Sequence, residues 1–526
     1  MLNSSPSKST HVRRTIKEDF GKYEITLFVL TQLSYYPICA SMLASSFYEP
    51  SIEYCSSRNA NLTVEGEELY EKWEFNSLLV RWDLHCQKSK VLMALPSATM
   101  FGALFGSLVS GWAADKYGRR ITIICCLAIV LLGNLTILSG LSESWKALIF
   151  VSFCIGAPCG GYMVCNLTLI IEALELSSSR LIVVSLNGWS ISMTFTAITA
   201  WLTLNWWSYH IVISTAIVIS IISFHLLTVE SSRWLASVNR LAEARKSAIW
   251  IAKKNNICTI NDSTESEWYE IVHLSPPIKP ASSNEPIGNF EVDENRNLSE
   301  RSGQFSSTQK RYGYSELCRH SRISIPLIGL CYCFIAASII SFGFYFYLDF
   351  LPGNRYLNMG LMGMFKFLFG LIPYALSKWC GRKPIAVVAL TICMICGWTG
   401  VLSILLTSDR NSIVSILSLI VSASIDPVWK VLHLYSAELF PTAVRSMARG
   451  VCSVGARLGS AVAPLITQLR FVNTVIPYVI FAMLLSIQTS VAFFALPETK
   501  NRPLPAELPE KFKRLKNSGN QQRTDE

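Results

Sequence analysis

Four charged side chains stand inside long apolar stretches of this sequence: Lys366, Asp426, Lys430 and Arg457. An ionised side chain at the centre of a bilayer costs about 2.5–3.5 kcal/mol even on lenient insertion scales, so each one needs a partner or a function. Asp426 and Lys430 stand one helical turn apart and can neutralise each other, although Pro427 between them loosens that turn. Lys366 and Arg457 then remain as cations, because no further carboxylate stands in the central part of any apolar stretch.

Two unmatched cations in a medium of low dielectric constant attract an anion by Coulomb forces. Arg457 is the sharper candidate, because a guanidinium keeps its charge and offers a planar fork that suits a carboxylate or a sulfate. Small residues on both sides of Arg457 leave room for a ligand. A buried lysine loses its proton more readily, so Lys366 is weaker evidence of charge. Two alternatives stay open: Arg457 snorkels to an interface or pairs with Asp426, and Lys366 pairs with an acid at a helix end.

The elements that must position these residues are membrane-spanning helices. The chain has 526 residues, of which 51% are hydrophobic and 16% are charged, a composition that excludes a soluble multidomain protein and is typical of a polytopic membrane protein. Twelve apolar stretches are long enough to cross a bilayer. We expect spans at about 23–47, 91–112, 121–141, 145–168, 181–204, 209–228, 324–348, 356–377, 385–407, 412–435, 447–469 and 475–496.

A short basic turn joins the second and third spans, and it contains Gly111, Asp115, Lys116, Gly118, Arg119 and Arg120. Gly118 permits a sharp reversal, and Asp115 can cap the following turn or pair with a basic neighbour. Small residues from Gly106 to Ala114 let another helix approach closely. A weaker copy of the turn, with Gly381, Arg382 and Lys383, joins the eighth and ninth spans. A hairpin repeated once in each half predicts two parallel halves around a central cavity.

Basic residues fall in the loops that this arrangement places on the inner side, which predicts that both termini are cytoplasmic. We expect a cytoplasmic N-terminus (1–22), a six-helix half (23–228) with an extracellular loop (48–89), and a cytoplasmic linker (229–320). A second six-helix half (321–496) and a cytoplasmic tail (497–526) follow. Residues 240–254 of the linker show the periodicity of an amphipathic helix. In the extracellular loop, Cys55 and Cys86 are candidates for a disulfide, and Asn61 is a candidate glycosylation site.

The turn Gly111-x-x-x-Asp115-Lys116-x-Gly118-Arg119-Arg120 resembles the loop signature of the major facilitator superfamily. Other elements resemble one family within it, the organic ion transporters of solute carrier family 22: Arg81-Trp82-Asp83-Leu84-His85-Cys86, Glu230-Ser231-Ser232-Arg233-Trp234-Leu235, Ala437-Glu438-Leu439-Phe440-Pro441-Thr442-Ala-Val-Arg445 and Leu496-Pro497-Glu498-Thr499-Lys500. The resemblance runs from the first span to about Leu508. It implies the all-α, twelve-helix facilitator fold in the plasma membrane and a small organic ion as the cargo.

The resemblance also bears on the cargo's charge. Arg457 is similar in position to the eleventh-span arginine of the family's anion and carnitine carriers, where cation carriers often have an acid. Lys366 occupies the position of an acid that is often found in the eighth span. Among aromatic residues, Tyr36 and Tyr345 are expected to contact the cargo, because the first and seventh spans are the symmetry-related central helices of this fold. Trp189 and Asn187 are further candidates.

Acids and arginines recur at the inner helix ends, as Glu172 with Arg180 and as Glu438 with Arg445. They can pair with each other, or with the basic turns across the two halves, and such pairs would latch the cytoplasmic side. The alternative is a role in folding and orientation only, since surface ion pairs are individually weak.

The sequence therefore predicts a carrier of organic anions or carboxylate-bearing zwitterions that works by alternating access. The rivals are a carrier of organic cations and a membrane scaffold that kept the fold without transporting. No nucleophile, metal-ligand spacing or phosphate-binding loop indicates an enzyme, a cofactor or ATP-driven transport. The net charge of +10 is spread over short loops and the tail, which does not favour nucleic-acid binding. Coupling to a counter-ion or an exchange anion stays open, as does the oligomeric state.

Overall fold

The computed structural model describes residues 20–48, 75–82, 90–140, 144–174, 177–186, 188–255, 321–347, 354–376, 379–406, 412–440 and 442–500. These residues are helical apart from their connections and one isolated bridge between Asn76 and Asn205. They include twelve helices that are long and apolar enough to cross a membrane. The predicted all-α fold with twelve spans is therefore confirmed. Cys55, Cys86, Asn61 and Asn187 lie outside the described residues, as does the side chain of Arg445.

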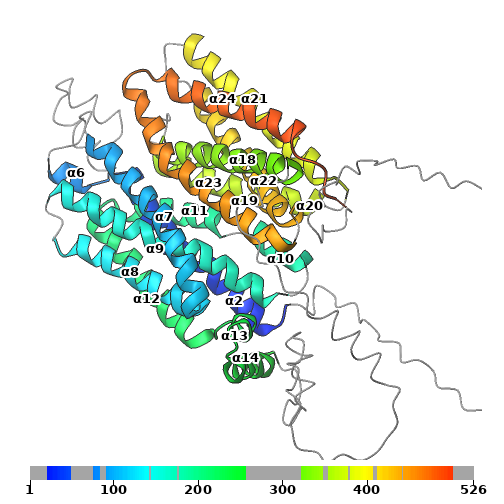
Figure 1. Cartoon of the computed structure of the whole chain (residues 1–526). Helices are drawn as coiled ribbons and strands as arrows, with labels where there is room; N and C mark the ends of the chain where they lie inside the picture. The colour runs from blue at the N-terminus through cyan, green and yellow to red at the C-terminus, as the bar shows by residue number, and fades with distance from the viewer. Residues whose placement is uncertain are drawn as a thin grey trace, which may run out of the picture.

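The first six spans form one bundle, drawn from blue to green in Figure 1. They are α2 (Lys22–Leu33) continued by α3 (Tyr35–Leu43), α7 (Lys90–Tyr117), α8 (Arg119–Leu138), α9 (Trp145–Ala173), α10 (Ser177–Ser185) continued by α11 (Trp189–Thr203), and α12 (Trp206–Leu227). The short helices η1 (Ala44–Phe47) and α6 (Leu78–Arg81) follow α3 and precede α7.

The last six spans form the second bundle, drawn from light green to red. They are α18 (Ser321–Phe346), α19 (Arg355–Gly370) continued by α20 (Ile372–Leu376), α21 (Arg382–Leu406), α22 (Ser412–Glu438), α23 (Thr442–Gln468) and α24 (Val475–Phe494), with η3 (Leu469–Phe471) between the last two. The two bundles meet where α11 packs on α19 and where α7 packs on α23.

Close packing of α7 against α9 depends on the small residues that the sequence places there. A Cβ at Gly106 would overlap the backbone of Ala157 on α9, so the two helices touch through their main chains. Gly111, in contrast, has open space around it. The prediction of close approach is correct at Gly106 and wrong at Gly111, although the neighbouring Ser110 still lies against Gly161 and Cys165 of α9.

Two spans of the first bundle are interrupted near their middle. The first is interrupted at Ser34, between α2 and α3, and in the fifth α10 ends at Ser185 and α11 begins at Trp189. The two breaks meet, since the Gln32 side-chain oxygen accepts a hydrogen bond from the Gly188 backbone N–H. Interrupted helices of this kind are how membrane carriers bring backbone and polar groups to a central site.

Two further helices, α13 (Ser232–Ser237) and α14 (Leu241–Lys254), pack at the end of the first bundle that carries Gly118, below the start of α2 in Figure 1. We call this end, which also carries Gly381 in the second bundle, the turn end. The amphipathic helix expected at 240–254 is present as α14. Asn255, the residue after α14, accepts a hydrogen bond from the Tyr23 N–H at 2.7 Å and donates one to Glu24 at 2.9 Å. These bonds connect α14 to the first span.

Candidate functional site

A cavity of about 160 Å³ lies between the two bundles. The first bundle contributes residues of α2, α3, α9, α10 and α11, and the second contributes residues of α18, α19, α22 and α23. All four charged residues that the sequence places at bilayer depth line this cavity: Lys366, Asp426, Lys430 and Arg457. Concave sites of mixed apolar and polar lining are where small organic ligands bind.

Arg457 projects from α23 into the cavity. Its Nη1 atom lies 3.5 Å from the Met163 sulfur on α9, so the side chain reaches from one bundle to the other. No carboxylate of the described residues forms an ion pair with it. The alternative of pairing with Asp426 is therefore wrong, and the place of Arg457 in the cavity lining, against Met163, does not fit snorkelling to an interface. A thioether is a weak acceptor, so the guanidinium keeps donors for another group.

Lys366 is fully buried on α19, with 1% of its surface exposed. Its Nζ donates a hydrogen bond of 3.0 Å to the carbonyl oxygen of Ser422 on α22, and it lies 5.2 Å from the centre of the Tyr345 ring. A carbonyl dipole and an aromatic face both stabilise an ammonium group without cancelling its charge. No acid of the described residues forms an ion pair with Lys366, in contrast to the alternative that it pairs with an acid at a helix end.

Asp426 and Lys430 form the expected pair on α22, with 3.7 Å between the carboxylate oxygen and Nζ. That distance is too long for a hydrogen bond, in keeping with a turn that contains Pro427. The described lining of the cavity thus holds three cations and one carboxylate. Because the surroundings are largely apolar, the resulting positive potential is weakly screened.

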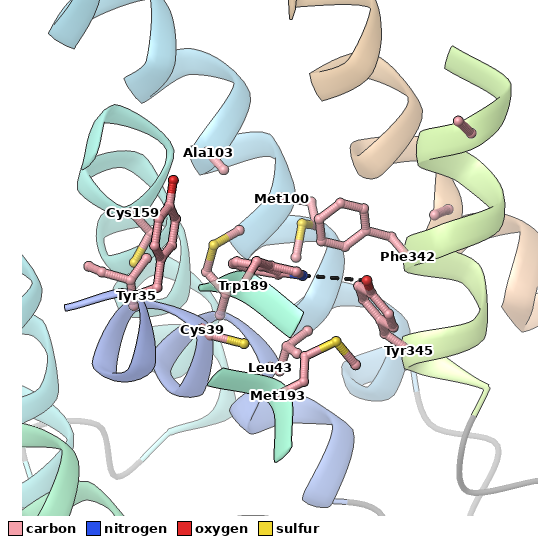
Figure 2. Packing of buried hydrophobic residues seen from close by; sticks show 14 of the residues in the cluster. Tyr35, Cys39, Leu43, Met100, Ala103, Cys159, Trp189, Met193, Phe342 and Tyr345 are labelled. Atoms are coloured by element: carbon pink, nitrogen blue, oxygen red, sulfur yellow. Dashed lines mark hydrogen bonds between the residues drawn. The ribbon is translucent and has the colours of Figure 1, made fainter. Parts of the chain in front are cut away.

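Aromatic side chains from both halves meet in the cavity lining. Figure 2 shows the Trp189 indole N–H of α11 pointing at the Tyr345 hydroxyl of α18, at 3.4 Å, with Phe342 beside both rings. Both Trp189 and Tyr345 line the cavity, as the sequence predicted. They also bond to each other across the two halves, so this hydrogen bond joins the two bundles.

Tyr36 does not line the cavity. Its hydroxyl forms a hydrogen bond of 2.7 Å with Thr199, and its ring packs edge-on against Phe195. Tyr35 lines the cavity instead. Neighbouring helical residues point about 100° apart, and the break at Ser34 decides which of the two tyrosines faces inward. The sequence pattern of two adjacent tyrosines carries no information about that break.

Among the polar lining residues that sequence reasoning missed are Asn166 on α9, and Trp429 and His433 on α22. Trp429 donates a 2.9 Å hydrogen bond to Ser341 and stacks on His433. Helical spacing could have predicted Trp429 and His433, since Trp429 lies one turn after Asp426 and His433 lies one turn after Trp429. Asn166 stands one turn after Met163, which places it on the same side of α9.

At the turn end of the first bundle, Glu230 holds the start of α8. Its carboxylate accepts hydrogen bonds from the backbone N–H groups of Arg119, at 2.8 Å, and Arg120, at 3.1 Å. The α8 N-terminus has no cap from its own segment, so Glu230 rather than Asp115 caps it. Gly118 adopts φ 117° and ψ 157°, a conformation that only glycine tolerates well. Of the two roles expected for Asp115, capping the turn and pairing with a basic neighbour, the structure shows the second: its carboxylate pairs with Arg119 at 2.8 Å.

The second bundle repeats this arrangement with different residues. Glu498 accepts hydrogen bonds from the backbone N–H groups of Arg382 and Lys383, at 3.0 and 3.1 Å, at the start of α21. A Cβ at Gly381 would overlap the Glu498 carboxylate, as one at Gly118 would overlap Glu230. Burial acts to raise the pKa of Glu498, but hydrogen bonds from the backbone outweigh it and leave the pKa below its usual value.

Arginine–glutamate pairs complete both turns. Arg119 lies 3.2 Å from Glu172 at the end of α9, and Arg382 lies 3.4 Å from Glu438 at the end of α22. Each pair joins helices of one half, so the expectation that they bridge the two halves is wrong for this conformation. The reason is geometric: the basic turn of each half lies beside the helix end of the same half. Arg180 and Arg233 both donate to the carbonyl of Leu174, just after α9.

Comparison with known proteins agrees with this architecture. The sequence model of the Major Facilitator Superfamily matches residues 87–464, and the chain belongs to this superfamily of membrane transporters. The fold resembles that of the xylose transporter XylE from E. coli in a partially occluded, inward-open conformation. The TM-score is 0.61 at 14% identity, over 92% of this chain and 100% of the other.

Two transporters are similar to this chain in sequence over most of its length. Solute carrier family 22 member 16 from Homo sapiens is 26% identical over 458 residues, which are 86% of this chain and 72% of the human protein. The organic cation transporter protein of Drosophila melanogaster is 24% identical over 441 residues, which are 83% of this chain and 74% of that protein. The chain therefore has homologues in solute carrier family 22 and is a membrane transporter, not an enzyme.

Proposed function

We propose that this protein carries organic anions or carboxylate-bearing zwitterions across the plasma membrane by alternating access. The observation that supports the proposal most directly is Arg457. Its guanidinium lies in a cavity between the two bundles, and no carboxylate of the described residues neutralises it. An anionic group of the cargo would supply the missing charge through a two-pronged hydrogen bond.

The rest of the cavity suits the body of an organic ion. Lys366 in the lining adds positive potential, while Tyr35, Trp189 and Phe342 offer aromatic surfaces. Aromatic surfaces favour a bulky apolar or ring-containing body. The cargo therefore combines a compact negative group with an apolar part, which is the usual form of an organic anion.

Transport would follow from a rocking of the two bundles around this cavity. In the described conformation the halves touch through the Trp189–Tyr345 contact and through Thr194, whose hydroxyl donates to the Gly360 carbonyl at 3.1 Å. The ion pairs at the turn end lie within each half, so they keep each bundle rigid while it moves. We place the turn end on the cytoplasmic side on the strength of its basic residues, with both termini there.

A second candidate function is transport of organic cations, and one observation favours it. Asp426 lines the cavity, and its Oδ2 atom accepts no hydrogen bond from the described residues. A relative is also named as an organic cation transporter. Lys430 already stands 3.7 Å from that carboxylate, however, so a cationic cargo would have to displace it.

Uptake by the purified full chain in liposomes tests the proposal. The probe is indole-3-acetate, which joins a carboxylate to an aromatic body. We expect Arg457→Gln to lower kcat/KM at least about tenfold, since a charge-assisted pair contributes roughly 1.5–3 kcal/mol, and Arg457→Lys to restore part of it. Arg245→Gln, at an exposed position on α14, is the matched control. Equal uptake by the two glutamine variants contradicts the proposal.

A further inference from the structure

Asn166 lines the cavity, and its buried carbonyl oxygen accepts no hydrogen bond from the described residues. The residue lies on α9 and is 1% exposed. Its Nδ2 donates a hydrogen bond of 3.3 Å to the carbonyl oxygen of Thr31, which also accepts one of 3.1 Å from the Tyr162 hydroxyl. A main-chain carbonyl only accepts, so this contact fixes the orientation of the amide. The Oδ1 atom therefore stays an acceptor.

The other buried lining atoms without a hydrogen-bond partner differ from this one. Asp426 has Lys430 beside it to balance its charge, and the Ser338 hydroxyl can rotate and act as donor or acceptor. The Asn166 oxygen has no charged neighbour of this kind, and an amide oxygen cannot act as a donor. A buried acceptor without a donor is destabilising, and a donor on a bound molecule would remove that cost.

The position of Asn166 relates it to the anion site. Arg457 touches Met163, and Met163 and Asn166 are three residues apart on the same face of α9. Side chains with that spacing stand about 5–6 Å apart at their Cβ atoms. A molecule whose negative group lies at Arg457 can thus place a second group, roughly one helical turn away, against the Asn166 oxygen.

We propose that Asn166 determines specificity, selecting organic anions that also carry an N–H or O–H donor about one helical turn from the negative group. The proposal rests on the proposed function, because it takes the anion at Arg457 as given. An aromatic carboxylate with a ring N–H, or a hydroxylated one, fits this description. An analogue of the same shape without the donor leaves the Asn166 oxygen unpaired, and sites built around a hydrogen bond reject such analogues strongly.

Two probes of nearly equal shape test this. Indole-3-acetate has a ring N–H, and 1-benzothiophene-3-acetate has a sulfur in its place and no donor. With the wild-type chain in liposomes, kcat/KM for the indole compound is expected to exceed that for the benzothiophene compound at least about tenfold. In Asn166→Leu, which keeps the branching at Cγ and removes the acceptor, the ratio should fall to about twofold or less. In the control Thr168→Val, whose hydroxyl bonds within α9, the high ratio should remain.

The outcomes separate the two proposals. A wild-type ratio near one, with uptake that still depends on Arg457, overturns the role of Asn166 and leaves the proposed function standing. The same holds if Asn166→Leu keeps the wild-type ratio. Absence of uptake for both probes, or uptake that does not depend on Arg457, overturns the proposed function and this inference with it. If Asn166→Leu does not fold, the wild-type ratio and the Asn166→Ser variant decide the question.

Discussion

Replacing Gly118 by alanine tests how the turn between α7 and α8 is built. Gly118 has φ 117° and ψ 157°, a region in which a residue with a Cβ is strained by about 1–3 kcal/mol. The added methyl group would also overlap the Glu230 carboxylate, which caps α8. Loss of a cap costs roughly 0.5–2 kcal/mol. Together the two effects predict a loss of about 2–4 kcal/mol in the stability of this end of the first bundle.

Gly111→Ala is the matched control, since it makes the same chemical change on the preceding helix, seven residues earlier in the same turn motif. Nothing lies within 4 Å of a Cβ at that position. Alanine is the better helix former by about 0.5–1 kcal/mol, so this variant should be neutral or slightly more stable.

The measurement is the apparent melting temperature of the purified chain in detergent, followed by intrinsic fluorescence. We expect Gly118→Ala to melt several degrees below the wild type and Gly111→Ala to melt at or above it. Equal melting temperatures for the two variants would refute the assignment of Glu230 as the cap and of Gly118 as the strained position.

Three further predictions follow from the same structure. Asp115→Asn should change the melting temperature little, because the Asp115 side chain is 75% exposed, whereas Glu172→Gln should lower it clearly, because the Glu172 side chain is 21% exposed; equal shifts in the two variants would contradict this. Glu498 has a lowered pKa in the folded chain, so its stabilising contribution is present above the carboxylate's ordinary pKa and is lost as pH falls through the lower, folded value. The melting temperature of the wild type should therefore fall with acidification by more than that of Glu498→Gln. Parallel profiles of melting temperature against pH would count against the cap. Tyr35→Phe should alter KM for indole-3-acetate uptake while Tyr36→Phe does not, since Tyr35 lines the cavity and Tyr36 bonds to Thr199; the reverse result would place the wrong tyrosine in the site.

Much of the fold could be predicted from sequence because a bilayer imposes simple rules. Length and apolarity identify a span wherever backbone groups must be satisfied internally, so all twelve spans were predicted. The second helix extends to Tyr117, beyond the predicted end at 112, because the charged residues Asp115 and Lys116 continue the helix. Only Gly118 forms the reversal.

The site was predictable in its charges and not in its details. Arg457 and Lys366 stood out because a cation at bilayer depth demands an explanation, and both line the cavity. The choice of Tyr35 over Tyr36 depends on the interruption of the helix at Ser34. Pro37 is consistent with that interruption, because it has no N–H to bond to the Leu33 carbonyl, but it does not show which tyrosine faces inward. The carboxylate partners of Arg119 and Arg382 depend on which helix ends lie side by side, and sequence spacing alone does not determine that.

Asn166 illustrates a different limit. In the sequence it begins an Asn-Leu-Thr triplet inside an apolar stretch, where such a triplet has no meaning for glycosylation. Its place beside the cavity becomes visible only in the structure, where its amide donates to Thr31 of another helix and its carbonyl oxygen accepts no hydrogen bond from the described residues. Tertiary contacts, which no local pattern records, decide whether such a residue packs or binds.

The central claim is that the cavity carries surplus positive charge and selects a negatively charged cargo. The most direct test compares liposome uptake of indole-3-acetate with that of tryptamine, which carries an ammonium in place of the carboxylate on the same ring system. The wild-type chain should favour indole-3-acetate, and Arg457→Glu should remove or reverse that preference, because it changes the charge at this position by two units. Preferential uptake of tryptamine by the wild type, or an anion preference that survives Arg457→Glu, would contradict the account.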